Sequence, residues 1–231
     1  MPGHVWHIRD FLDINRTLDV WPVGRHDRDV VGLTKEQRFE KTMNDMRLSA
    51  RFDALDPISV TDIGGPVWAF RRERPRNLKA RPAMSIGGYP VVTPTCRAVL
   101  EQSDLGQVDF HRIEVLDINR KEVVWPELYV LHIRNAKHSI DMDAAIADGT
   151  LRDGAANLRT RDKKPLPPLW VVRADRTLTL QSSALEGPDL WRETQLHSGL
   201  RTNLYMSESL RTLLDEAGMA KAWGLARVAV R

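Results

Sequence analysis

Four side chains that could bind a metal ion lie close together in the sequence: His132, His138, Asp141 and Asp143. Two imidazoles and two carboxylates suit a divalent transition-metal ion, which could serve a small hydrolase. Their spacing matches no established metal-binding motif. His132 lies in an apolar run typical of a strand, and either aspartate could cap a short helix. We therefore expect structural roles for them, with no metal and no cofactor, and keep a metal-dependent hydrolase as the alternative.

The candidate nucleophiles also have structural explanations. The single cysteine, Cys96, falls on the apolar stripe of an expected helix, where a buried thiol is inert. Ser207 precedes another helix as a capping residue, and no Gly-x-Ser-x-Gly turn surrounds it. The glycine pairs of the chain lack the spacing of a phosphate-binding loop. The sequence predicts no catalytic residue, and we expect the protein not to be an enzyme.

A basic segment stands out from a chain whose net charge is only +3. Its cations, set against the single acid Glu73, are Arg71, Arg72, Arg74, Arg76, Lys79 and Arg81. These side chains could bind nucleic-acid phosphates, but the segment has no aromatic residues on which bases could stack. A solvated, exposed loop is the favoured interpretation, and the same loop could equally contact an acidic protein surface. A nucleic-acid-binding module using residues 71–81 is the alternative.

Trp21 and Trp125 are the tryptophans that we would test at an interface, because each precedes a proline near the edge of an expected strand. Tryptophan is common at the energetic centre of protein interfaces, although it is also a frequent core residue. The proline-rich stretch 148–168 is expected to be a loop and to share in any contact surface. No run approaches the ~20 apolar residues that a membrane span requires, so no membrane contact is expected.

Two segments of the chain share one pattern of strand, helix cap, helix and strand. Thr93 aligns with Ser207 as the capping residue, and the apolar helix positions then coincide. Strands are expected to follow at Phe110–Val115 and Leu225–Val230. We interpret this as a duplicated unit whose two copies share one core.

The other elements complete an α+β fold with a mixed or mostly antiparallel sheet and a few short helices. Thr34–Gln37 has the pattern of a capping box that begins a helix ending near Leu48. Short strands are expected at Pro57–Asp62 and Val67–Phe70, and the apolar run Glu127–Ile133 is typical of a central strand. We expect a poorly defined N-terminal portion at 1–84 and a core domain at 85–231.

The order of these motifs resembles a family of bacterial immunity proteins from polymorphic toxin systems, the Myxococcus-type immunity domain, formerly a domain of unknown function. The resemblance covers about residues 85–230, and its most specific part is the segment from Asp189 to Gly218. That segment contains the aromatic–arginine pair Trp191–Arg192 and the Met206-Ser-Glu sequence that opens a leucine-rich helix. The longer link after Gly218 departs from the family pattern.

The resemblance implies a cytoplasmic protein that binds a cognate toxin and neutralises it without turnover or cofactor. The single cysteine and the absence of a secretory-signal pattern at the start of the sequence also favour the cytoplasm. The matching positions are structural, so the resemblance assigns no functional residue. The toxin-binding candidates therefore come from the residues alone: Arg71, Arg72, Arg74, Arg76, Trp21 and Trp125.

Overall fold

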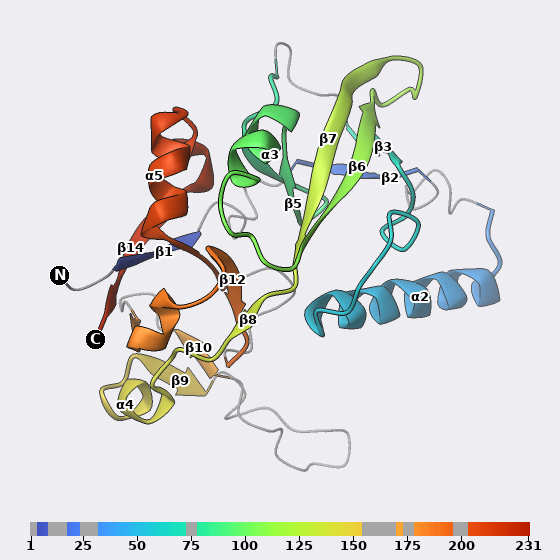
Figure 1. Cartoon of the computed structure of the whole chain (residues 1–231). Coiled ribbons are helices and arrows are strands. Elements are labelled where there is room, and N and C mark those ends of the chain that lie inside the picture. Colours follow the sequence, from blue (N-terminus) through green and yellow to red (C-terminus); the bar gives the residue numbers. More distant parts are fainter. Residues whose placement is uncertain are drawn as a thin grey trace, which may run out of the picture.

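The structure of the chain is a computed structural model. It describes residues 4–8, 18–23, 32–72, 78–153, 170–172, 178–195 and 203–231. Two curled, mixed sheets and a few helices make up most of these ranges (Figure 1). This confirms the α+β fold class that the sequence predicts.

The first sheet has the strand order β2-β3-β6-β7-β5-β4. Its strands are β2 (Val20–Pro22), β3 (Val67–Phe70), β4 (Ala83–Ile86), β5 (Tyr89–Val92), β6 (Val108–Leu116) and β7 (Val123–Ile133). Leu18, which precedes β2, pairs with Ile86 of β4, so the two edges of this sheet meet. The sheet curls around an apolar core that includes Trp68, Ile113 and Val130.

The second sheet has the order β11-β14-β1-β13-β12-β8. Its strands are β1 (His4–Ile8), β8 (Ala136–Lys137), β11 (Thr179–Leu180), β12 (Leu190–Glu193), β13 (Leu204–Ser207) and β14 (Leu225–Val230). A pairing between Ile140 and Leu180 likewise joins its two edges. Its core is covered by α4 (Met142–Ala147) and the 3-10 helix η3 (Ser182–Leu185). The strands β9 (Leu151–Asp153) and β10 (Trp170–Val172) form a separate pair.

The two sheets repeat one pattern. The order β3-β6-β7-β5-β4 in the first matches β11-β14-β1-β13-β12 in the second. In both, the opening pair is parallel and the later pairs are antiparallel. The helices α3 (Pro94–Leu100) and α5 (Glu208–Glu216) occupy matching connections, from β5 to β6 and from β13 to β14. The duplicated unit is therefore confirmed, and β1 takes the place in the second sheet that β7 takes in the first.

Equivalent contacts hold both helices. Arg97 of α3 lies 4.5 Å above the ring of Tyr129, and Arg211 of α5 lies 5.1 Å above that of Trp6. The helices pack against each other over one apolar core (Figure 1). That core contains residues of both copies: Val92, Cys96, Leu100, Leu131, Met206, Leu210, Leu214 and, from the 3-10 helix η4 (Ala220–Trp223), Trp223. The copies thus share a core, as expected.

The helix α2 (Lys35–Asp53) extends beyond its expected end at Leu48. Its capping box is confirmed, since Thr34 Oγ1 accepts the Gln37 N–H at 3.2 Å and Gln37 Oε1 accepts the Thr34 N–H at 2.9 Å. Phe39 is 68% exposed, so this apolar side chain is not buried near the start of the helix. At the other end, Phe52 is buried in the core of the first sheet.

The expected division after residue 84 does not correspond to a structural boundary. Residue 84 lies inside β4, which pairs with β5. The N-terminal portion also supplies β1 between β13 and β14, and it supplies β2 and β3 to the first sheet. Long-range strand pairing, which local sequence patterns do not reveal, joins the two portions. In the part of the chain that the structure describes, no helix is both long and apolar enough to cross a membrane.

Candidate functional site

Three of the expected toxin contacts meet at the outer strand β2. The Trp21 indole N–H donates to Asp19 Oδ1 at 2.9 Å, and the Arg71 guanidinium lies 5.5 Å from the centre of the indole ring. Arg71 Nη1 lies 3.7 Å from Asp19 Oδ1, and Arg72 Nε lies 3.2 Å from Asp19 Oδ2. The Arg72 side chain is 86% exposed. We call Asp19, Trp21, Arg71 and Arg72 the β2 patch.

The remaining expected contacts are placed differently. Trp125 is only 7% exposed, and its ring centre lies 5.5 Å from that of Phe70, so it belongs to the core of the first sheet. It offers little surface to a partner, because its indole fills space between strands. Arg74 and Arg76 lie outside the described residues, as does the stretch from 154 to 169 that makes up most of the expected loop.

The structure separates the four metal-ligand candidates of the sequence. Asp141 caps α4 by accepting the Ala144 N–H at 3.0 Å, and it also pairs with Arg231 at 2.6 Å. His138 is exposed, whereas His132 is completely buried on β7. The structural role that we expected for Asp141 is therefore confirmed.

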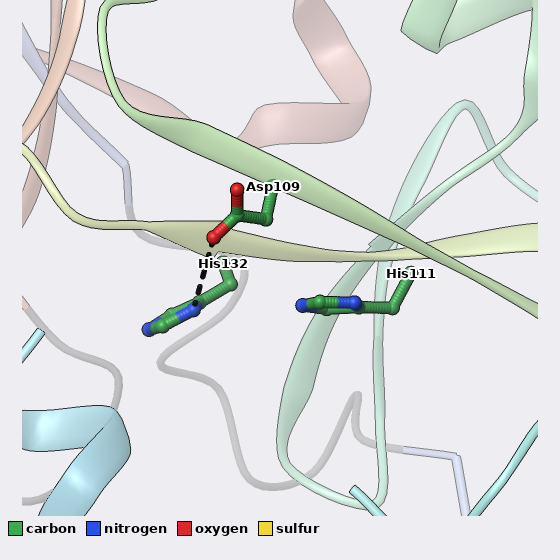
Figure 2. Close-up of side chains that lie close together, drawn as sticks. All are labelled: Asp109, His111 and His132. Atoms are coloured by element: carbon green, nitrogen blue, oxygen red, sulfur yellow. Dashed lines mark ion pairs between the residues drawn. The ribbon is translucent and has the colours of Figure 1, made fainter. Parts of the chain in front are cut away.

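His132 instead meets two residues of β6 that the sequence analysis did not select. Asp109 pairs with His132 in the register of β6 and β7, and His111 follows two positions along the same strand. Alternate residues of a strand point to the same face, so these side chains converge (Figure 2). One possible ligand atom from each of Asp109, His111 and His132 lies within 4.8 Å of the others. We call these three residues the β6–β7 cluster.

Burial controls the charge of this cluster. It lowers the pKa of His132 from 6.5 to about 4; the Asp109 carboxylate acts in the opposite direction, while His111, Arg134 and Arg192 lower the pKa further. The His132 imidazole is consequently neutral at pH 7. His132 Nδ1 lies 3.8 Å from Asp109 Oδ2, the contact drawn in Figure 2, and the Arg134 Nε–H donates to the same oxygen at 2.8 Å.

The segment from Asp189 to Gly218 is built as a framework. Asp189 Oδ1 accepts hydrogen bonds from the hydroxyl groups of Ser207 and Ser209, and Asp189 Oδ2 accepts the Asp104 N–H at 3.1 Å. This carboxylate therefore ties the start of α5 to the turn after α3, which links the two copies.

In comparisons with known proteins, no family model and no curated protein matches this chain.

Proposed function

We propose that this protein is an immunity protein that binds a cognate antibacterial toxin in the cytoplasm and neutralises it stoichiometrically. The β2 patch is the observation that carries the proposal. Tryptophan and arginine dominate the energetic centres of protein interfaces, and here both are held in place before any partner binds. The resemblance of Asp189–Gly218 to the immunity family supports the same conclusion.

The patch has the features of a docking site for an acidic surface. Asp19 offers its two carboxylate oxygens to Trp21 and the two arginines, so the side chains lose little freedom on binding. Arg72 points much of its surface to solvent, where it can pair with a carboxylate of the toxin. β2 stands at one end of the strand order of the first sheet, so the patch lies on an outer strand.

The experiment begins with the neighbouring gene. If it encodes a protein whose expression stops growth, co-expression of this chain should restore growth, and the two purified proteins should form a one-to-one complex. The double variant Arg71→Ala/Arg72→Ala should weaken that complex at least tenfold. The variant Lys121→Ala/Lys221→Ala removes the same charge from exposed positions elsewhere and should bind as the native protein does.

Two results would contradict the proposal. One is a neighbouring toxic protein whose growth arrest is unaffected by co-expression. The other is binding of duplex DNA that weakens steeply with salt and depends on Arg71 and Arg72, which would instead assign a nucleic-acid-binding function to the basic segment. Equal affinities of the two double variants for the toxin would show that the toxin does not bind at the β2 patch.

A further inference from the structure

The β6–β7 cluster contains buried polar atoms without partners. His132 has no exposed surface, and neither of its ring nitrogens has a hydrogen-bond partner among the described residues. His111 Nε2 is also buried and unpartnered there. Most buried polar side-chain atoms in proteins have a partner, and a bound ion is one cause of an exception. Two such imidazoles beside one carboxylate therefore require an explanation.

From this arrangement we propose that Asp109, His111 and His132 bind a divalent transition-metal ion of the zinc type. Two imidazole nitrogens and one carboxylate oxygen are a common donor set for zinc, iron(II), cobalt and nickel, whereas magnesium and calcium favour oxygen ligands. Asp109 and His132 are paired across β6 and β7, and His111 lies two positions from Asp109 on the same strand, so the backbone fixes the spacing of the three side chains. This set retains His132 from the sequence analysis and replaces its other expected neighbours.

The distances allow this ion with a small adjustment. Ligands ~2.1 Å from a tetrahedral zinc ion lie ~3.4 Å from one another. The ligand atoms here lie within 4.8 Å of one another. Side-chain rotations that move these atoms by about 1 Å would bring them to coordination distance. Figure 2 shows the His111 ring extending toward His132, with the Asp109 carboxylate above the His132 ring.

The surroundings hold the ligands and modify the charge. Arg134 donates to Asp109, which orients the carboxylate as an outer-shell partner does in many metal sites. The Phe52 ring lies 4.3 Å from that of His132, centre to centre, and limits its rotation. The nearby charges have opposite effects. The negative charge of Asp62 favours positive charge at His111, whereas the positive charges of Arg134 and Arg192 disfavour it at His132.

The cluster lies beside a cavity, and its carboxylate is partly exposed. His111 forms part of the wall of a cavity of about 550 Å³ that lies along β6. Its other walls include Val60, Pro66, Arg112 and Glu114. The Asp109 side chain is 33% exposed, so an ion can reach the cluster at this carboxylate, and water can occupy a coordination position that the protein leaves open.

The test uses the full chain without a histidine tag, freed of metal by a chelator and dialysis. Titration with Zn²⁺ alone should show one site of micromolar or tighter affinity, and Co²⁺ should give the visible absorption of a nitrogen- and oxygen-ligated ion. His111→Ala and Asp109→Asn should each weaken Zn²⁺ binding at least tenfold. His138→Ala removes an exposed imidazole outside the cluster and should leave affinity unchanged.

His132→Ala opens a buried space, so its folding must be checked by circular dichroism. His111 and Asp109 are only partly buried, and their variants keep the test decisive if His132→Ala does not fold. No stoichiometric uptake of Zn²⁺ or Co²⁺ would overturn the proposal. Uptake that is reduced equally by His138→Ala and His111→Ala would also overturn it, because it would show adventitious surface binding. The toxin is not needed, so this result is independent of the proposed function.

Discussion

Glu193 is a carboxylate that folding removes almost completely from water. Glu193 is 2% exposed, and its carboxylate accepts hydrogen bonds from the backbone N–H and the hydroxyl of Ser139. Burial raises the pKa of Glu193 above its ordinary 4.5, although the bonds from Ser139 act in the opposite direction. The folded state therefore holds this proton more tightly than the unfolded chain does.

Replacing Glu193 should change how stability depends on pH. The contribution of this group is fully present below about pH 4.5 and is lost as the pH rises through the elevated pKa. Glu193→Gln cannot ionise, so its free energy of unfolding should improve relative to that of the native protein as the pH rises from 4.5 to 7. Urea unfolding at several pH values measures this difference, with exposed Glu216→Gln as the control. A difference that does not vary with pH would show that burial has little effect on Glu193.

Cys96 should not react with thiol reagents while the protein is folded. It has no exposed surface, and burial raises its pKa from 9.0 to about 12, so almost no thiolate is present at pH 8. A disulfide reagent that releases a coloured thiolate should show negligible modification until denaturant is added. The matched control moves the thiol to an exposed position of α3 by combining Cys96→Ala with Ala98→Cys, which should react rapidly. Equal rates for both proteins would contradict the burial.

At the scale of elements, the two helix caps are equivalent in position but not in their contacts. Thr93 Oγ1 accepts the Cys96 N–H at 3.3 Å, and Ser207 Oγ accepts the Leu210 N–H at 3.1 Å. Ser207 also donates to Asp189, whereas the cap bond is the only side-chain hydrogen bond described for Thr93. The cap of α5 is thus also part of the link between the copies.

Loss of a cap should therefore be more costly in α5 than in α3. Thr93→Ala should lower the free energy of unfolding by about 1 kcal/mol, the usual value for a cap. Ser207→Ala should lower it by about 2 kcal/mol, because a further hydrogen bond to a carboxylate is lost. Chemical denaturation measures both, and Thr95→Ala at an exposed position of α3 is the control. Values for the two caps that match this control would refute the interpretation.

Local elements could be predicted from the sequence where their determinants lie within a few residues. The caps at Thr34, Thr93 and Ser207 are such cases, and the last two also revealed the duplication. The strand expected at Pro57–Asp62 is wrong, because Asp62 accepts the Ser59 N–H at 2.7 Å and closes a turn there. A hydrogen bond from a side chain to the backbone of a turn competes with the pairing of a strand. The closely spaced Ser59 and Asp62 were the feature of the sequence that could have indicated this turn.

The β6–β7 cluster could not be assembled in the same way. The sequence places His132 near His138 and Asp141, but an antiparallel pairing places it opposite Asp109. Register depends on which strands become neighbours, and a shift of one residue would turn His132 to the other face. Asp109 immediately precedes the strand expected at Phe110–Val115 and His111 lies within it, and this alternation of Asp109 and His111 was the only local indication.

At the scale of the whole molecule, the second sheet depends on the N-terminal strand. β1 pairs with β13 on one side and β14 on the other, and Val5 has no exposed surface. Substitutions in β1 are therefore expected to be costly, because this strand is paired on both sides within the sheet.

A matched pair of substitutions tests that dependence. Val5→Ala should lower the free energy of unfolding by about 2 kcal/mol, because it leaves a space in the core of the second sheet. Val123→Ala makes the same change at a side chain that is 53% exposed and should cost less than about 0.5 kcal/mol. Thermal and urea unfolding compare the two. Similar small effects would mean that β1 is not an integral part of the sheet.

The position of β1 also bears on how the protein is made by the ribosome. The strands of the first sheet all precede residue 134, so that sheet can close while the rest is still being synthesised. β1 emerges earlier still, but its two neighbours are made last. Until β13 and β14 have been made, the apolar side chains of β1 have neither neighbouring strand to pack beside and are accessible to chaperones. The second sheet is completed only when β1 pairs with these two later strands.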